Sequence, residues 1–282
     1  MPYPLLVFTT DFGLADAYAG VLKGVALTIN PELRLLDLTH QVQAQNITQG
    51  SLLLGINHNY FPKNAIHVAV VDPGVGTDRR AVLLSTPWGR FVSPDNGLLS
   101  GVVAGYLKSP PAVSGAVNLP PELTAVHLTD PQYWRLPLSN TFHGRDVFTP
   151  VASHLSLGVP AADMGEAIDS LFYLPMLRHV EQHGKISGQV VYRDIYGNLV
   201  TNIPADALPE DDVVMVRIKD KHIQGLSRSF NSSEENNTDS QCGPKLIALV
   251  GSHGYLEVAV PNGSAAALLE ADEGETVEVL PR

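Results

Sequence analysis

Three groups of residues in this 282-residue sequence carry acidic and basic side chains at spacings that could support chemistry. The first is Asp11 with Asp16, which flank the turn after an apolar run. Carboxylates in such a turn can bind the hydroxyl groups or the ammonium group of a ligand. Asp near a helix N-terminus also caps free backbone amides, and this structural role is the main alternative for Asp16 and a weaker one for Asp11.

The second group runs from Asp72 to Arg80. A proline and two glycines within it predict a tight loop that holds the Asp72 carboxylate close to the guanidiniums of Arg79 and Arg80. The glycine spacing fits neither the dinucleotide-binding fingerprint nor the P-loop, because no third glycine and no Gly-Lys-Ser/Thr follow. The alternative is an ordinary turn with a surface ion pair.

The third group spans Asn140 to Asp146 and places His143, Arg145 and Asp146 in a loop before a predicted helix. The chain has ten histidines, and most must be ordinary surface or capped residues, so His143 alone carries little weight. Histidine, aspartate and arginine from different loops can still form a base with its orienting partner, or a polar network that binds and polarises water.

The elements that must position these groups alternate in type. Apolar runs at 4–9, 35–38 and 66–71 predict buried strands, and helical periodicity predicts helices over 14–29 and 46–58. The apolar face of the first helix would consist of Leu14, Tyr18, Val21, Leu22, Val25 and Ile29. Strands that alternate with helices in this way predict an α/β fold with a mostly parallel sheet.

Ligands of parallel α/β sheets bind at the carboxyl ends of the strands, and two aspartates stand at such ends. Asp11 follows the first strand and Asp72 follows the third. The sequence predicts further strands at 81–86, 90–93 and 124–128, and a helix over 150–157 with Thr149 as its cap and Pro150 in its first turn.

After about residue 180 the pattern changes to short strands broken by turn clusters, which predicts a second, smaller domain. We therefore predict an N-terminal α/β domain over 1–167, a linker at 168–184 and an antiparallel β domain, barrel-like or sandwich-like, over 185–282. Its strands are expected at 185–193, 213–218, 246–250, 255–260 and 276–280. The polar segment 227–243 is typical of a surface loop.

Composition narrows the class of protein. Lys plus Arg number 18 against 29 Asp plus Glu, a net charge of −11 without any basic run, so the sequence offers no phosphate-binding surface for nucleic acid. The single cysteine, Cys242, excludes an internal disulfide and argues against a structural zinc. Without a signal peptide or an apolar run of about 18 residues, we expect no membrane span and a cytoplasmic location.

Several motifs follow one another along the chain. They are Thr10-Asp11-Phe12-Gly13 with Asp16, Asp37-Leu38-Thr39-His40, Val71-Asp72-Pro73-Gly74-Val75-Gly76 with Arg79, Pro94-Asp95-Asn96-Gly97, Thr141-Phe142-His143-Gly144-Arg145-Asp146, and Tyr196-Gly197-Asn198 with Thr201-Asn202. Together they resemble the S-adenosyl-L-methionine (SAM) hydroxide adenosyltransferases, the SAM hydrolases related to the fluorinating and chlorinating adenosyl enzymes. The resemblance spans nearly the whole chain and weakens only over 220–243.

The resemblance implies a Rossmann-like N-terminal domain and a small C-terminal β-barrel. It also implies a homotrimer in which SAM lies between the N-terminal domain of one subunit and the C-terminal domain of the next. SAM would be the substrate, with no cofactor and no metal. The implied reaction is substitution at the ribose C5′, in which water or hydroxide attacks in line, opposite the sulfonium, and yields adenosine and L-methionine.

The same resemblance implies roles for single residues. Asp72, Arg79 and His143 match the triad that positions and activates the water. Halogenating relatives carry Tyr at the position of Asp72 and Ser at that of Gly144, so this sequence fits a hydrolase. The residues implied to bind SAM are Asp11 at the ribose hydroxyls, Asp16 at the methionine ammonium, Asp194 and Asn198 at adenosine, Tyr196 against the base, and Ser252, Glu257 and Val260 on the last strands.

The chemistry agrees with these roles. A sulfonium departs as a neutral thioether and needs no acid, so the site must chiefly present a desolvated, oriented water. Asp72 or His143 would accept a hydrogen bond from that water, while Arg79 holds the water or keeps Asp72 ionised. The residues alone leave open which group takes the proton.

Four other functions remain as alternatives. A metal-dependent nucleotidase or phosphatase could use Asp11, Asp37, Asp72, His143 and Asp146 as ligands. A non-catalytic module could bind SAM or adenosine without turnover. A SAM-dependent halogenase belongs to the same class of reaction, and an oxidoreductase ranks lowest because the glycine fingerprint is missing.

Overall fold

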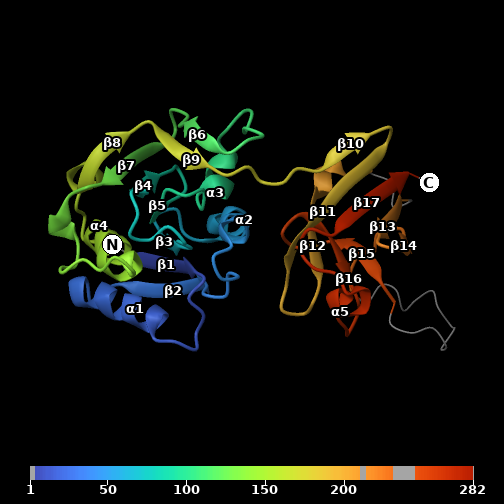
Figure 1. Cartoon of the computed structure of the whole chain (residues 1–282), viewed down its shortest axis with the longest axis horizontal. Coiled ribbons are helices and arrows are strands. Elements are labelled where there is room, and N and C mark those ends of the chain that lie inside the picture. Colours follow the sequence, from blue (N-terminus) through green and yellow to red (C-terminus); the bar gives the residue numbers. More distant parts are fainter. Residues whose placement is uncertain (1–3, 210–213, 231–244, 282) are drawn as a thin grey trace. The chain divides into compact units, whose positions relative to one another are not determined.

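The computed structural model describes residues 4–209, 214–230 and 245–281 (Figure 1). Cys242 and most of the predicted loop at 227–243 lie outside the described residues, so the predictions made for them are not addressed by the structure.

The chain divides into two units, Met1–Met176 and Leu177–Arg282. The division falls inside the predicted linker at 168–184, and that stretch also contains two strands that the sequence did not predict, β9 (Ser170–Tyr173) and β10 (Val180–Gln182). We call the two parts unit 1 and unit 2 and describe each by itself.

Unit 1 is built on a mixed sheet with the strand order β2-β1-β3-β5-β4-β7-β8. Its strands are β1 (Leu5–Thr10), β2 (Arg34–Thr39), β3 (Ile66–Val70), β4 (Ala81–Ser85), β5 (Arg90–Pro94), β7 (Thr124–Leu128) and β8 (Gly165–Ile168). The pairs among β2, β1, β3 and β5 are parallel, as predicted, and those among β5, β4, β7 and β8 are antiparallel. The direction reverses after Ser85 because the turn 86–89 is too short for a crossover helix. A separate pair joins β6 (Gly115–Asn118) to β9.

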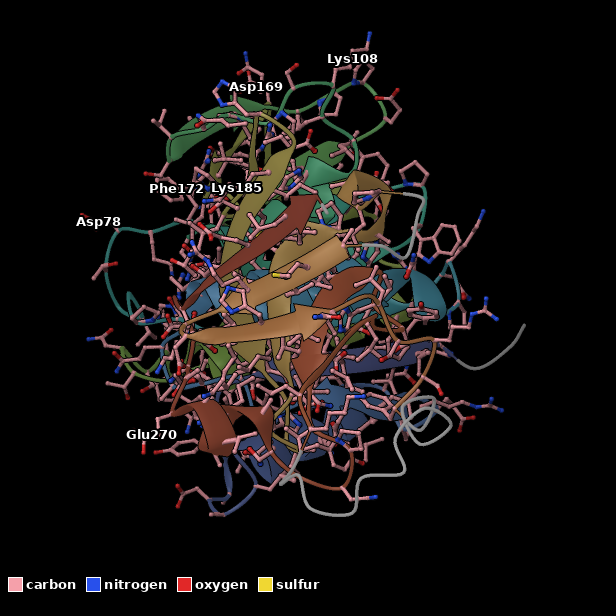
Figure 2. The ribbon with its side chains drawn as sticks, turned by 90° about the vertical axis from the view of Figure 1, so that its right-hand side faces the viewer. Asp78, Lys108, Asp169, Phe172, Lys185 and Glu270 are labelled. Atoms are coloured by element: carbon pink, nitrogen blue, oxygen red, sulfur yellow. The ribbon has the colours of Figure 1, made fainter. Side chains whose placement is uncertain are left out.

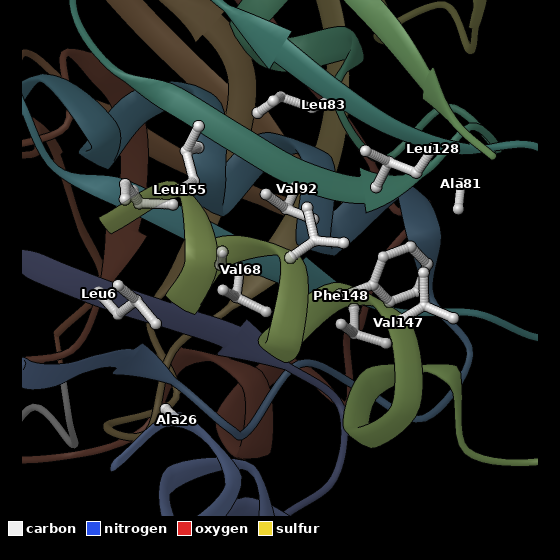
Figure 3. Packing of buried hydrophobic residues seen from close by; sticks show 14 of the residues in the cluster. Leu6, Ala26, Val68, Ala81, Leu83, Val92, Leu128, Val147, Phe148 and Leu155 are labelled. Atoms are coloured by element: carbon white, nitrogen blue, oxygen red, sulfur yellow. The ribbon is translucent and has the colours of Figure 1, made fainter. Parts of the chain in front are cut away.

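Helices cover both faces of this sheet. Successive residues of β3 alternate between two hydrophobic clusters, with Val68 in one and Ala69 in the other. The Val68 cluster packs against α1 (Tyr18–Ile29) and α4 (Thr149–Ser156), as Figure 3 shows for Ala26 and Leu155. The Ala69 cluster packs against α2 (Ile47–Asn57) and α3 (Ser100–Ala104). This double cover is the Rossmann-like arrangement that the resemblance implies.

The first helix differs from its prediction. It begins at Tyr18 instead of at residue 14, because the chain before it forms a loop in which the Gly13 N–H donates to the His40 carbonyl at 2.7 Å. The residues that the helix buries are Ala19, Leu22 and Ala26. Leu14, Tyr18 and Val21, which were predicted on the buried face, are exposed.

The prediction that Thr149 caps a helix is wrong. The chain is already helical before this residue, in the π-helical segment Gly144–Phe148, so Thr149 lies inside a continuous helical run and is buried. Pro150 stands in the first turn of α4, as predicted. The π-helical segment follows His143 directly, and such segments are frequent at functional sites.

Unit 2 is an antiparallel sheet with the strand order β14-β13-β17-β11-β12-β16-β15, and β10 pairs with β11. Its strands are β11 (Lys185–Arg193), β12 (Leu199–Pro204), β13 (Val214–Ile218), β14 (Lys221–Gln224), β15 (Ile247–Val250), β16 (Tyr255–Ala259) and β17 (Thr276–Pro281). The end strands β14 and β15 contact each other, so the sheet curls into the expected barrel-like form. A short helix that the sequence did not predict, α5 (Ala265–Leu269), packs on its core.

Across residues 4–209, 214–230 and 245–281, no helix has the length and apolar character needed to traverse a lipid bilayer.

His67 on β3 should make the stability of unit 1 depend on pH. Burial lowers its pKa to about 3, and its ring stacks on Phe91 at 4.7 Å between centroids. The unfolded chain binds a proton near pH 6.5 and the folded chain does not, so stability is full above pH 6.5 and falls as the pH drops toward 3. Between pH 7 and pH 5 we expect a loss of about 2 kcal/mol from this group.

The measurement is urea unfolding of the wild type and of His67→Leu at both pH values. Between pH 7 and pH 5, the free energy of unfolding of the wild type should fall by about 2 kcal/mol more than that of His67→Leu. A difference that stays constant would show that His67 does not carry this proton linkage.

Candidate functional site

A pocket of about 390 Å³ opens at the carboxyl ends of β1 and β3 in unit 1. Asp11, directly after β1, and Asp72, two residues after β3, both line it. The wall also includes the start of α1, Gln45, the stretch Thr141–Gly144 that leads into the π-helical segment, and further residues after β1 and around the end of β3 (Phe12, Val70, Pro73 and Val75). The strand-end aspartates and His143 therefore share one cavity.

Asp72, Arg79 and His143 form a connected set in this wall. Arg79 Nε donates to both carboxylate oxygens of Asp72 at 3.0 Å, and Nη2 donates to Oδ2 at 2.5 Å. The same Nη2 lies 2.8 Å from His143 Nδ1. Asp72 and His143 line the pocket whereas Arg79 does not, and the side chain of Arg79 is only 11% exposed. Arg79 thus joins the two pocket residues from behind.

The contact with Arg79 fixes where His143 carries its proton. A guanidinium can only donate, so Nδ1 must accept, and a neutral ring then has its hydrogen on Nε2. Burial lowers the pKa of His143, and the charge of Arg79 lowers it further against the opposing effects of Asp72 and Asp146, so the ring is neutral at pH 7. Within the described residues Nε2 is buried without a hydrogen-bond partner. His143 therefore holds an unused N–H donor.

Gly76 allows the two loops of this set to meet. Its φ is +79°, and a Cβ at this position would lie 2.3 Å from the carbonyl oxygen of Asn140. Any side chain would push the loop of Asp72 away from the stretch that carries His143. Asp78, in the same loop, projects from the surface (Figure 2), so only one of the two loop aspartates belongs to the pocket.

Arg145 and Asp146, predicted beside His143, do not line the pocket. Asp146 is fully buried, and Arg145 donates to both of its oxygens at 2.7 and 2.8 Å while the Ser139 N–H donates to Oδ2 at 2.9 Å. Burial opposes the charge of Asp146, but these hydrogen bonds outweigh it and lower the pKa of the carboxyl. Asp146 thereby ties the chain before His143 to the π-helical segment.

The two aspartates near α1 lie in different surroundings. Asp11 lines the pocket, and its Oδ2 accepts from the Gln45 N–H at 2.8 Å. Asp16 is exposed and does not line the pocket. It does not cap α1 either, since the residue at the cap position is Ala17 and no side chain caps the helix there.

A buried histidine supports the strand end that carries Asp11. His40 Nδ1 lies 2.7 Å from Thr10 Oγ1, and its Nε2 lies 3.1 Å from Asp37 Oδ1. Asp37 in turn accepts from Lys23 at 2.6 Å. This chain of contacts joins β1, β2 and α1 immediately beside the pocket.

Unit 2 has a pocket of about 470 Å³ that brings together three of the predicted binding residues, Tyr196, Asn198 and Val260. Asp194 is not part of its lining but organises the turn, because its Oδ1 accepts from the backbone N–H groups of Tyr196 and Asn198 at 2.9 and 2.8 Å. Its Oδ2 accepts from the Asn198 side chain at 2.9 Å.

Ser252 and Glu257, the other predicted binding residues of unit 2, lie outside that pocket. Ser252 is exposed. Glu257 is 5% exposed, and its Oε2 lies 3.2 Å from His253 Nε2. Its Oε1 is buried without a hydrogen-bond partner among the described residues.

Sequence reasoning did not assign Phe12, Tyr18, Gln45 or Phe142 to the site, although all four line the pocket of unit 1. Helical periodicity predicted Tyr18 in the core, but in the structure Tyr18 is exposed and is not part of the core. The signal that could have found it is its position, because the first turn of a helix after a strand end lies beside the carboxyl edge of the sheet.

Among the described residues, the side chains that a metal-dependent enzyme would use as ligands do not come together. No group of three or more His, Cys, Asp and Glu side chains in the described part of the chain is placed to hold a metal ion. Three of the proposed ligands are engaged by arginine or lysine instead: Asp37 by Lys23, Asp72 by Arg79 and Asp146 by Arg145. This arrangement disfavours that alternative.

Comparison with known proteins identifies the same family that the sequence motifs resemble. Residues 6–165 match the family model described as the SAM hydroxide adenosyltransferase N-terminal domain, and residues 188–278 match that of the C-terminal domain. Among solved structures, an uncharacterized conserved protein from Thermotoga maritima has a TM-score of 0.83 and 34% identity, with 98% of this chain and 99% of that chain covered.

Curated relatives match over almost their whole length. A protein of Salinispora arenicola named (R)-S-adenosyl-L-methionine hydrolase is 36% identical, with 98% of this chain and 97% of the relative covered. One of the same name from Thermus thermophilus is 34% identical, with 97% and 98% covered. A fluorinase of Actinopolyspora mzabensis is more distant, at 22% identity, with 98% of this chain and 97% of the fluorinase covered.

Proposed function

The chain belongs to the SAM hydroxide adenosyltransferase family, and on that premise we propose that it hydrolyses SAM to adenosine and L-methionine. The observation that carries the proposal is the set of Asp72, Arg79 and His143, which joins two loops in the wall of a pocket at the carboxyl edge of the sheet. The cytoplasmic location expected from the sequence is part of the proposal, and cell fractionation tests it.

The nucleophile is water, held between Asp72 and His143. The Nε2–H of His143 donates to the water oxygen, and Asp72 accepts a water hydrogen, which leaves an oxygen lone pair for C5′. Because the Nδ1 lone pair of His143 is taken up by Arg79, Asp72 is the proton acceptor of the set. Asp72 Oδ2 accepts from both Nε and Nη2 of Arg79, whereas Oδ1 accepts from Nε alone among the described residues, so Oδ1 retains a lone pair for the water.

The reaction is a single displacement. The bond from the water oxygen to C5′ forms as the bond from C5′ to sulfur breaks, and the electron pair of that bond neutralises the sulfonium. The leaving group is the thioether of methionine, so no acid acts on it. The contribution of the set is orientation and partial proton removal.

The remaining residues bind the substrate in this proposal. Asp11 accepts from the ribose hydroxyls, as an acidic residue does after the strand in dinucleotide folds, and Asp16 meets the methionine ammonium. The residues of unit 2 assigned to adenosine and the rest of SAM are Asp194, Tyr196, Asn198, Ser252, Glu257 and Val260. The support is that three of them, Tyr196, Asn198 and Val260, line one pocket.

The test is incubation of EDTA-treated protein with SAM in ¹⁸O-labelled water, with and without chloride, followed by mass spectrometry. Both sulfonium epimers are supplied, because the curated relatives are named for the (R) form. We expect adenosine labelled at O5′ and unlabelled methionine under both conditions. Bound but uncleaved SAM would favour the binding module, 5′-chloroadenosine the halogenase, and activity only on metal addition the metal-dependent enzyme.

We further propose a homotrimer in which the pocket of unit 1 in one subunit acts with the pocket of unit 2 in the next. The support is that the assigned residues fall into two pockets in different units. Analytical ultracentrifugation measures the oligomeric state.

Mixing of inactive variants tests the shared site. In trimers formed at random from equal amounts of Asp72→Asn and Asn198→Ala, about a quarter of the sites combine an intact unit 1 with an intact unit 2, so about a quarter of the wild-type activity should return. Each variant alone is the control. No recovery in verified mixed trimers would place the whole site within one subunit.

A further inference from the structure

Three aromatic side chains gather in the pocket of unit 1, and the mechanism above uses none of them. Phe12, Tyr18 and Phe142 all line it. The ring centroids of Phe12 lie 5.8 Å from those of Tyr18 and Phe142, and those of Tyr18 and Phe142 lie 5.2 Å apart. The rings come from the turn after β1, the start of α1 and the stretch before the π-helical segment, so three separate parts of the chain build this wall.

Core packing does not explain the whole cluster. Phe12 and Phe142 are half-buried against the core beneath α1 and α4, but Tyr18 is not part of that core and is 49% exposed. Its tilted and edge-on contacts with the two phenylalanines keep the three rings from stacking flat on one another. Aromatic surface therefore remains on the pocket side of unit 1.

The rings lie where a cation would be attracted. The charged side chains that line the pocket are Asp11 and Asp72, with Arg79 paired behind them, so no lining residue in the described part of the chain is a cation. Phe142 already makes a cation–π contact with Arg145, whose Cζ lies 5.3 Å from the ring centroid. Phe12 and Tyr18 have no cation–π partner among the described residues. Ring faces attract cations, more strongly in a site shielded from water.

We propose that Phe12 and Tyr18, with Phe142 beside them, form the surface that binds the sulfonium of the substrate and separates it from neutral thioethers. This inference rests on the proposed function and deepens it. The sulfonium charge is permanent and disappears when the bond from C5′ to sulfur breaks. The rings therefore favour substrate over a thioether of the same shape, and they release their hold once the reaction is complete.

The direction of the kinetic effect follows from the loss of charge. An interaction that is stronger with the bound substrate than with the transition state improves binding without raising the rate of the chemical step. Replacement of Tyr18 by leucine should therefore raise KM for SAM while kcat does not fall. A residue with only a structural role in the site would lower kcat as well.

The decisive comparison is the affinity for SAM against that for S-adenosyl-L-homocysteine, a neutral thioether. Binding is measured by calorimetry in the Asp72→Asn background, where SAM is consumed about a hundredfold to ten-thousandfold more slowly. Tyr18→Leu and Phe12→Leu should each weaken SAM binding by about threefold to thirtyfold and leave S-adenosyl-L-homocysteine binding within about twofold. The control Tyr18→Phe keeps the ring and should keep the wild-type ratio.

Asp11→Ala serves as the opposite comparison. Its expected effect is on the ribose, which both ligands share, so it should weaken both by the same factor. Equal losses for both ligands in Tyr18→Leu and Phe12→Leu would overturn the sulfonium assignment and leave the hydrolase proposal standing. Absence of SAM binding in the Asp72→Asn background, together with no turnover by the wild type, would instead remove the proposed function itself.

Discussion

Asp72→Asn should lower kcat for SAM by about a hundredfold to ten-thousandfold, the usual contribution of a positioned proton acceptor. Asparagine keeps the shape of the side chain but replaces one acceptor oxygen by a donor group. The water then loses the partner that takes its hydrogen, while the groups that bind the substrate are untouched. KM and the calorimetric affinity for SAM should stay within a few-fold of wild type.

The control is the exposed neighbour Asp78→Asn, which removes a charge from the same loop without touching the pocket. It should keep wild-type kcat. Substantial activity in Asp72→Asn, with correct folding confirmed by circular dichroism, would exclude Asp72 as the acceptor. Loss of both binding and rate would instead indicate that the pair with Arg79 mainly maintains the shape of the loop.

His143→Ala should lower kcat by about a hundredfold to a thousandfold, and His143→Gln should recover a measurable part of the lost activity. Removal of one hydrogen-bond donor from a site of developing charge commonly has an effect of this size. The glutamine amide can place an N–H near the position of Nε2, so it restores a donor but not a base. Equal defects in the two variants would show that His143 acts as the base after all.

The pH profile supplies an independent readout for the same residue. Burial first, and then the charge of Arg79, hold the pKa of His143 below its usual value, against Asp72 and Asp146. The active ring is neutral, so kcat/KM should stay level as the pH falls through 6.5 and decline only at lower pH, where a protonated Nδ1 would face Arg79. This acid limb should be absent from His143→Gln.

The parts of the fold that were predictable are those that local pattern determines. The strands that precede Asp11 and Asp72 appear within a residue or so of their predicted bounds, since continuous apolar runs bounded by turns have few other solutions. The antiparallel half of the sheet was accessible in principle from the short turn at 86–89. Whether a pair of strands is parallel depends on the length of the connection more than on the strands themselves.

What pattern could not supply is the use of a residue once it is in place. The spacing of Tyr18 fits the apolar face of a helix, yet the side chain lies at the pocket, because periodicity does not distinguish burial by core from contact with a ligand. Likewise, the sequence motif gives no sign that His143 has a different role from Arg145 and Asp146. Only the fold separates the imidazole that lines the pocket from the ion pair that holds its loop.

The position of Arg79 behind the pocket decides which nucleophiles can compete. Its charge is matched by Asp72, the imidazole is neutral, and the charged residues that line the cavity among the described residues are both carboxylates. Before substrate binds, the lining of the cavity therefore disfavours small anions and offers them no free cation. Within the described residues the protein thus offers no binding group to an anion that would compete with water, and in the proposed reaction the nucleophile is selected by exclusion as well as by activation.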